Sequence, residues 1–121
     1  MTRFVQHDND TVTDTQTGLI WMKKTLVKDV THQDAEQAVA DLGDGWRLPT
    51  IQELFSLADH SKHSPAIDAD AFPDTESDWY WTSTSCAWND SARWVVYFYY
   101  GYVNNYPRHY YACVRAVRAG Q

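Results

Sequence analysis

The sequence lacks several features that would place it in a common class of protein. Its 121 residues contain no run approaching the ~20 apolar residues that a membrane-spanning helix needs, and its N-terminus lacks the apolar stretch of a signal peptide. Only two cysteines occur, Cys86 and Cys113, which excludes a zinc site built from cysteines and a disulfide framework. We therefore expect neither membrane insertion nor a signal peptide, while the two cysteines leave free thiols and one disulfide equally open.

The rest of the composition is that of an ordinary globular domain. Hydrophobic residues make up 44% of the chain and charged residues 21%, values that exclude wholesale disorder and collagen-like repeats. A chain of this length has room for one domain and buries enough surface to fold without disulfides. We expect a single domain over residues 1–121.

Charge and aromatic residues divide the chain into two unlike parts. Residues 1–78 carry a net charge of −9, whereas residues 79–121 carry +3. Seven of the eight tyrosines lie between Tyr97 and Tyr111. An acidic first part and a tyrosine-rich second part predict a scaffold over 1–78 and a ligand-binding half over 79–121.

Local signals predict a hairpin followed by two short helices in the first part. Thr11–Asp14 and Leu19–Met22 alternate around a turn that contains Gly18. Thr31 is a helix cap, and apolar residues recur at helical spacing until Gly43. Thr50 and Glu53 form the pattern of a capping box at the start of a second helix. Residues 61–78 read as an irregular loop.

Strand signals dominate the second part. They cover 79–84, 93–99, 102–104 and 112–118, with a turn at Tyr100 and Gly101. The order of elements predicts an α+β fold with a mainly antiparallel, twisted sheet and long loops. Alternation puts Trp94, Val96 and Phe98 on the core face of their strand, and Val103 inward on the next.

The same alternation directs the tyrosines away from the core. Their segment mixes Tyr with Asn, His and Arg and contains no Lys, Glu or Gln, as antibody binding sites do. A contiguous exposed aromatic patch usually marks a binding site, although tyrosines are also common as ordinary strand residues. The candidate ligand-binding residues are Tyr97, Tyr99, Tyr100, Tyr102, Asn104, Tyr106, Arg108, His109, Tyr110 and Tyr111.

Five segments spread over nearly the whole chain carry a resemblance to a known family. They are Thr11-Val12-Thr13-Asp14, Thr17-Gly18-Leu19-Ile20-Trp21, Gly45-Trp46-Arg47-Leu48-Pro49-Thr50 with Glu53-Leu54, Tyr80-Trp81-Thr82-Ser83-Thr84 and Val114-Arg115-Ala116-Val117-Arg118. The chain resembles the C-type-lectin-like domain at the C-terminus of collagen-like bacterial adhesins. It is similar to the branch that serves as variable proteins of diversity-generating retroelements, including those of archaea and their viruses.

In that branch, adenine-directed mutagenesis diversifies chosen codons near the C-terminus. Randomising the adenines of AAC codons never yields Lys, Glu, Gln, Met or Trp, and residues 97–111 contain none of these five types. The resemblance implies that the ten candidate residues form the diversified face. It also implies a framework of Trp94, Phe98, Gly101, Val103, Val114 and Val117.

Two segments carry residue types that bind metals, but neither has the pattern of a metal site. Trp88-Asn89-Asp90 spells a tripeptide with which calcium-dependent lectins bind ion and sugar, but no Glu-Pro-Asn or Gln-Pro-Asp precedes it to complete the six to eight oxygens. His60, His63 and Asp59 offer ligands at a spacing that carries little weight. We expect no metal and no cofactor.

Two other functions are also disfavoured. Cys86 and Cys113 invite comparison with formylglycine-generating enzymes of the same fold, but no acid, base or second thiol accompanies either residue in sequence. Stacking of nucleic acid bases on the tyrosines is opposed by the net charge of −6, and Arg115 and Arg118 are expected to pair with acids such as Glu53.

The sequence thus predicts a non-enzymatic, ligand-binding variable protein. The resemblance implies a macromolecular target, most plausibly a surface protein, and display on a virion or cell surface; it leaves oligomeric state and compartment open. A carbohydrate-binding, lectin-like adhesin is the alternative, and an enzyme of the formylglycine-generating kind is the second.

Overall fold

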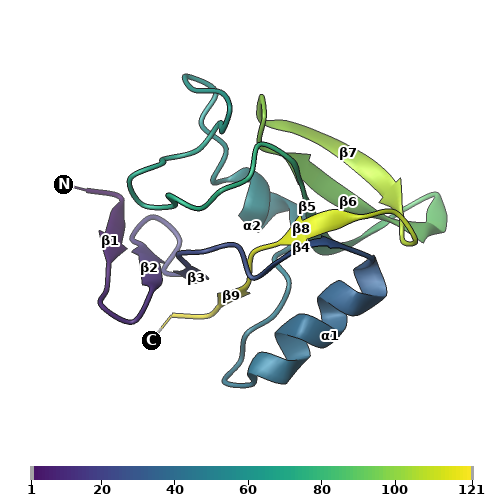
Figure 1. The fold of residues 1–121 in the computed structure, drawn as a ribbon, viewed down its shortest axis with the longest axis horizontal. Coiled ribbons are helices and arrows are strands. Elements are labelled where there is room, and N and C mark those ends of the chain that lie inside the picture. The colour runs from purple at the N-terminus through teal and green to yellow at the C-terminus, as the bar shows by residue number, and fades with distance from the viewer. Residues whose placement is uncertain (1, 121) are drawn as a thin grey trace.

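Two β-sheets and two short helices form the protein, which a computed structural model describes over residues 2–120 (Figure 1). One sheet has four strands in the order β1-β2-β3-β9, and the other has five in the order β4-β8-β5-β6-β7. The strands are β1 (Phe4–Gln6), β2 (Thr11–Asp14), β3 (Ile20–Met22), β4 (Val27–Val30), β5 (Trp79–Cys86), β6 (Asn89–Tyr97), β7 (Tyr102–Pro107), β8 (Ala112–Val114) and β9 (Val117–Arg118). The helices are α1 (His32–Leu42) and α2 (Ile51–Phe55). The predicted α+β class with two short helices is confirmed.

The locally encoded elements form as the sequence predicts. Strands β2 and β3 pair as an antiparallel hairpin, and Thr31 caps α1 by accepting a hydrogen bond from the Asp34 N–H. At α2 the Thr50 side chain accepts from the Glu53 N–H, while the Glu53 carboxylate accepts from the Thr50 N–H. Each signal acts within a few residues, so distant contacts are not needed to specify it.

The predicted C-terminal strand is two strands in two different sheets. β8 runs parallel to β5, with Tyr80 opposite Cys113, whereas β9 pairs antiparallel with β3. The chain therefore crosses from the five-stranded to the four-stranded sheet between Val114 and Val117. Strands β1 and β4 also form, although the sequence reading did not predict them.

The five-stranded sheet is buried on both faces near its centre. Tyr80, Val96 and Phe98 belong to a cluster on the side of α2, and Trp81 and Val95 belong to a second cluster on the side of α1. The prediction that only the Val96 face of β6 is core is therefore wrong, because Ala35 and Val39 of α1 cover the other face and pack with Val95 in one cluster.

Two buried charges join distant parts of the chain. Asp14 is completely buried and accepts hydrogen bonds from Arg3 Nε at 2.9 Å and Nη2 at 2.8 Å. Arg115 is also completely buried, and its guanidinium donates to backbone carbonyls of Met22 and Lys23. The expected pairing of Arg115 with Glu53 is wrong: Glu53 pairs with Arg47 at 2.7 Å instead.

The carboxylates of Asp14 and Glu53 make folding stability sensitive to acid. Burial raises the pKa of Asp14, but hydrogen bonds from Arg3 and the Gln16 N–H outweigh it and hold the pKa below its usual value. Hydrogen bonds from Arg47 lower the pKa of Glu53 against the opposing effect of burial. Both groups therefore bind protons more weakly in the folded than in the unfolded chain.

We expect the free energy of unfolding to fall as the pH drops below the usual carboxyl pKa of ~4, because the unfolded chain then takes up protons first. Glu53→Gln should cost about 1 to 2 kcal/mol at pH 7 and flatten this acid dependence. Urea unfolding between pH 7 and pH 3 measures the loss at pH 7 and its dependence on pH. Asp8→Asn, at an exposed position, is the control. An unchanged slope in Glu53→Gln would contradict the assignment.

Candidate ligand-binding surface

The hairpin of β6 and β7 brings the predicted site residues to one face. Tyr97 lies opposite Tyr102, Val95 opposite Asn104 and Arg93 opposite Tyr106. Directly opposite residues of an antiparallel pair share a face, so Tyr102, Asn104 and Tyr106 follow one another along the same side of β7. The hairpin turns at Gly101, whose φ of +86° suits glycine, and the His60 ring donates from Nε2 to the Gly101 carbonyl at 2.8 Å.

Four tyrosines at the turn contact one another in sequence. The ring centroids of Tyr97 and Tyr99 are 5.8 Å apart and stacked, those of Tyr99 and Tyr100 are 4.4 Å apart, and those of Tyr100 and Tyr102 are 5.6 Å apart. Edge and offset contacts at such separations are favourable and restrict ring motion. The turn end of the hairpin therefore presents a preorganised aromatic group.

A second aromatic group lies at the other end of β7. Tyr106 contacts Tyr110 edge-on at 5.2 Å, and Tyr110 contacts His109 at 5.1 Å. Trp79 connects the two groups, because its ring stacks on Tyr97 at 4.3 Å and lies 5.1 Å from Tyr106. We call the ten predicted residues together with Trp79 the tyrosine surface.

The sequence does not predict Trp79 as a surface residue. The sequence predicts a strand that starts at Trp79 but not its partner residues, and pairing of β5 with β6 puts Trp79 directly opposite Tyr97. A prediction of strand register, in addition to strand position, was needed to find it.

The members of the tyrosine surface differ in exposure. Tyr102 is 57% exposed and Tyr111 66%, and Tyr100, Asn104, His109 and Tyr110 are exposed as well. Tyr97, Tyr99, Tyr106 and Arg108 are half-buried. Tyr106 packs against the second core cluster, and Arg108 pairs with Glu36 at 3.2 Å. Ring contacts and strand register thus bring eight of the ten residues together, all except Arg108 and Tyr111. Tyr106 and Arg108 are tied to the scaffold.

Two phenols of the tyrosine surface, those of Tyr100 and Tyr106, have a raised pKa. The adjacent hydroxyl of Tyr99 raises the pKa of Tyr100, and burial raises the pKa of Tyr106. These two phenols therefore stay protonated at neutral pH, and each can both donate and accept a hydrogen bond while its ring supplies apolar contact.

Alanine substitutions should separate exposed from scaffold-bound tyrosines. We expect Tyr106→Ala to lower the free energy of unfolding by about 2 kcal/mol, because its ring packs on the core. Tyr111→Ala should change it by less than about 0.5 kcal/mol. Urea unfolding of the two variants makes the comparison, and equal losses would mean that Tyr111 also supports the fold.

The other predicted candidates lie outside the tyrosine surface. Cys86 and Cys113 are separate buried thiols, and burial raises the pKa of Cys113 to about 12. Trp88 and Asn89 form the tip between β5 and β6, where Asn89 Oδ1 accepts from the Ser91 N–H. Within residues 2–120, no three His, Cys, Asp or Glu side chains gather as metal ligands would. No helix in this range has the length and hydropathy to span a membrane.

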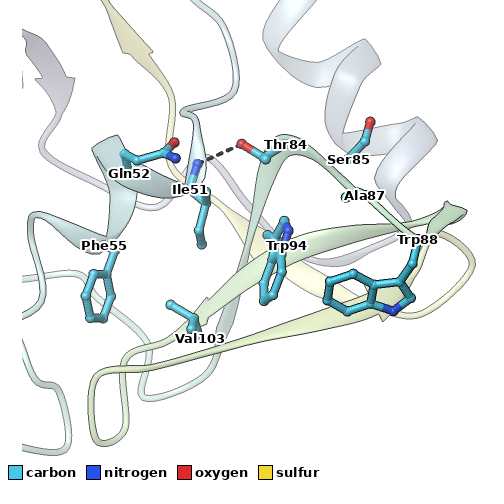
Figure 2. A pocket seen from close by; sticks show the side chains of 9 residues that line it. All are labelled: Ile51, Gln52, Phe55, Thr84, Ser85, Ala87, Trp88, Trp94 and Val103. Atoms are coloured by element: carbon cyan, nitrogen blue, oxygen red, sulfur yellow. Dashed lines mark hydrogen bonds between the residues drawn. The ribbon is translucent and has the colours of Figure 1, made fainter.

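An apolar groove occupies the opposite face of the same hairpin (Figure 2). Its volume is about 530 Å³, and Figure 2 shows Phe55, Val103, Trp94 and Trp88 following one another along it. The remaining lining residues are Ile51, Gln52, Thr84, Ser85 and Ala87.

The apolar groove corrects two sequence predictions. Trp94 and Val103 lie on the predicted face, but Trp94 is only half-buried and Val103 is 42% exposed. The reason is the length of α2, which ends at Phe55 and leaves this end of the sheet without a covering element.

Comparison with known proteins identifies the family. A family model described as the Lcl C-terminal domain matches residues 10–118, nearly the whole chain. The protein therefore belongs to this family of C-type-lectin-like variable domains associated with diversity-generating retroelements. No curated protein matches the sequence.

Proposed function

We propose that this member of the Lcl C-terminal domain family is a diversified recognition protein whose tyrosine surface binds a macromolecular target, namely a protein. The family supports a variable, ligand-binding domain. The observation that carries the proposal is the continuous aromatic contact from Tyr100 through Tyr97 and Trp79 to Tyr110.

A protein target is favoured by the chemistry of the surface. Tyrosine supplies a large contact area while few side-chain torsions are lost on binding, and neighbouring ring contacts already restrict those torsions. The exposed side chains of Asn104 and His109 can add directional hydrogen bonds, Asn104 at the centre of the tyrosine surface and His109 at one end of it. Carbohydrate is the alternative ligand, because sugars also stack on aromatic rings.

Recognition without catalysis is part of the proposal. The two thiols are buried away from the tyrosine surface, and the pKa values of Tyr100 and Tyr106 within that surface are raised above the usual value. Alanine at Cys86 and Cys113 should therefore leave target binding intact. Loss of a chemical turnover in these variants would favour the enzyme alternative.

The gene neighbourhood tests diversification directly. We expect a near-copy of the codons for residues 79–118 beside a reverse transcriptase gene, differing from the coding copy at adenines. The differences should fall on the ten predicted residues and spare Trp79, Phe98 and Gly101. Differences scattered over all codons would contradict the assignment of these residues.

A display library tests recognition itself. The six exposed positions of the tyrosine surface are randomised with NNC codons, and the library is selected against immobilised lysozyme and, separately, against a panel of immobilised glycans. A matched library randomises exposed α1 positions, among them Gln33, Gln37 and Asp41. We expect lysozyme binders from the first library alone. Binders to glycans alone would favour the lectin alternative, and none from either panel would contradict the proposal.

A further inference from the structure

The apolar groove lies beside a strand edge that carries unpaired backbone groups. Strand β7 is last in the order of its sheet, and no strand within residues 2–120 pairs with its outer side. The Arg108 N–H donates to the Ser91 carbonyl, which lies opposite it in the same register. The even-numbered residues of β7 therefore direct their backbone N–H and C=O groups toward β6. Because hydrogen-bonded pairs alternate along an antiparallel ladder, Val103 and Asn105 direct their backbone groups outward.

Only Val103 offers both a donor and an acceptor at this edge. The Asn105 N–H is taken by its neighbour's side chain, Asn104 Oδ1, at 2.8 Å, and Pro107 has no N–H. An added strand therefore finds one complete pairing position. A residue placed opposite Val103 in antiparallel register exchanges two hydrogen bonds with it and directs its own side chain to the same face as Val103.

That face is the apolar groove. Val103 lines the groove with Phe55 and Trp94, and the exposed fractions of Phe55, Val103 and Trp88 are 39%, 42% and 71%. No lining residue is ionisable, so a charged ligand group would lose hydration without gaining a partner. A volume of about 530 Å³ lies within the usual range of ligand sites and accepts a bulky neutral side chain.

We propose that the edge of β7 and the apolar groove form a second binding site, for an extended peptide segment with a bulky apolar residue opposite Val103. The backbone of the segment pairs with Val103, and its apolar side chain enters the groove between Phe55 and Trp94. This site uses the face of the hairpin opposite to the tyrosine surface, so it does not depend on the function proposed for that surface.

A blocked pentapeptide with a central leucine flanked by threonines serves as the probe. Titration into ¹⁵N-labelled protein should shift the Val103 amide signal and the indole N–H signals of Trp88 and Trp94. Replacing the leucine by serine should weaken binding about tenfold, because the apolar side chain is lost. Methylating the leucine nitrogen should weaken it about fivefold, because one backbone hydrogen bond is lost.

Variants of the protein test the two parts of the site separately. Val103→Pro removes the outward N–H at a position where an edge strand tolerates proline, and should weaken binding about fivefold. Trp88→Ala changes an exposed groove side chain without touching the backbone and should also weaken binding. Tyr111→Ala removes a similarly exposed ring that does not line the groove, so it is the matched control and should leave peptide affinity unchanged.

Three results would overturn the proposal. The first is no shift at millimolar peptide. The second is equal affinity of the methylated and unmethylated peptides, which would mean that the groove binds apolar groups without strand pairing. The third is concentration-dependent broadening of the same signals without peptide, which would assign the groove to a second copy of the chain.

Discussion

Replacing Arg115 by alanine should lower the free energy of unfolding by about 4 kcal/mol. The guanidinium is completely buried and donates to Met22 O at 2.8 Å, Lys23 O at 2.7 Å and Thr75 Oγ1 at 2.7 Å. Its Cζ also lies 4.9 Å from the ring centroid of Phe72. Removal leaves three acceptors without their donor and a cavity among packed rings, and each lost charge-assisted bond costs about 1.5 to 3 kcal/mol when fully buried, less where water can reach the acceptor.

Urea unfolding at pH 7 measures this loss. Arg118→Ala is the matched control, because Arg118 lies in the adjacent strand β9, is half-buried and stacks on Trp46 at 5.0 Å. We expect it to cost no more than about 1 kcal/mol. The loss of unfolding free energy in Arg115→Lys should lie between those of Arg115→Ala and Arg118→Ala, since an ammonium cannot reach three acceptors in the planar geometry of a guanidinium. A loss below 1 kcal/mol in Arg115→Ala would show that water or neighbouring side chains replace its bonds.

Replacing Phe98 by alanine should cost about 3 to 5 kcal/mol, the usual loss for a completely buried phenylalanine. The ring packs in the core cluster on the side of α2 and contacts Tyr80 edge-on at 5.3 Å. The Phe98 backbone also holds the loop before β5, because its N–H donates to Asp78 O and its carbonyl accepts from the Ala66 N–H. Phe98 thus anchors the turn that carries the tyrosines on either side.

The neighbouring tyrosine provides the control for Phe98. Tyr100→Ala, two residues along the same turn, is 48% exposed and should cost less than about 0.5 kcal/mol. Thermal unfolding of both variants, followed by near-ultraviolet circular dichroism of the aromatic groups, distinguishes loss of the core from loss of a surface ring. A stable Phe98→Ala with an unchanged aromatic spectrum would contradict its role as an anchor.

Features set by neighbours in sequence were predictable, and those set by distant contacts were not. The capping box of Thr50 and Glu53 and the turn at Gly101 depend on a few adjacent residues, and both form as expected. The second layer over Val95 depends on where α1 packs against the sheet, and period-two alternation carries no information about that. Alternation alone assigns a residue to a face of the sheet, while tertiary packing decides whether that face is covered.

The tyrosine surface also combines features set by neighbours in sequence with features set by distant contacts. Alternation and composition placed Tyr102, Asn104 and the other candidates on one side of the chain. The link through Trp79 follows from the register of β5 against β6, and the partial burial of Tyr106 follows from its contact with the second core cluster. Neither contact has a local signal in the sequence. The exposed ends of the surface were therefore easier to predict than its centre.

Alternation along β7 restricts how this hairpin can vary. Successive side chains point to opposite sides, so one inserted or deleted residue would exchange the sets on the two sides beyond that point. Tyr106 would move to the side of Trp94, and its place against Trp79 would be lost. Changes that replace bases and preserve codon number keep every phenol on its own side. The number of residues in β7 must therefore stay constant, whereas the identity of its exposed residues can change.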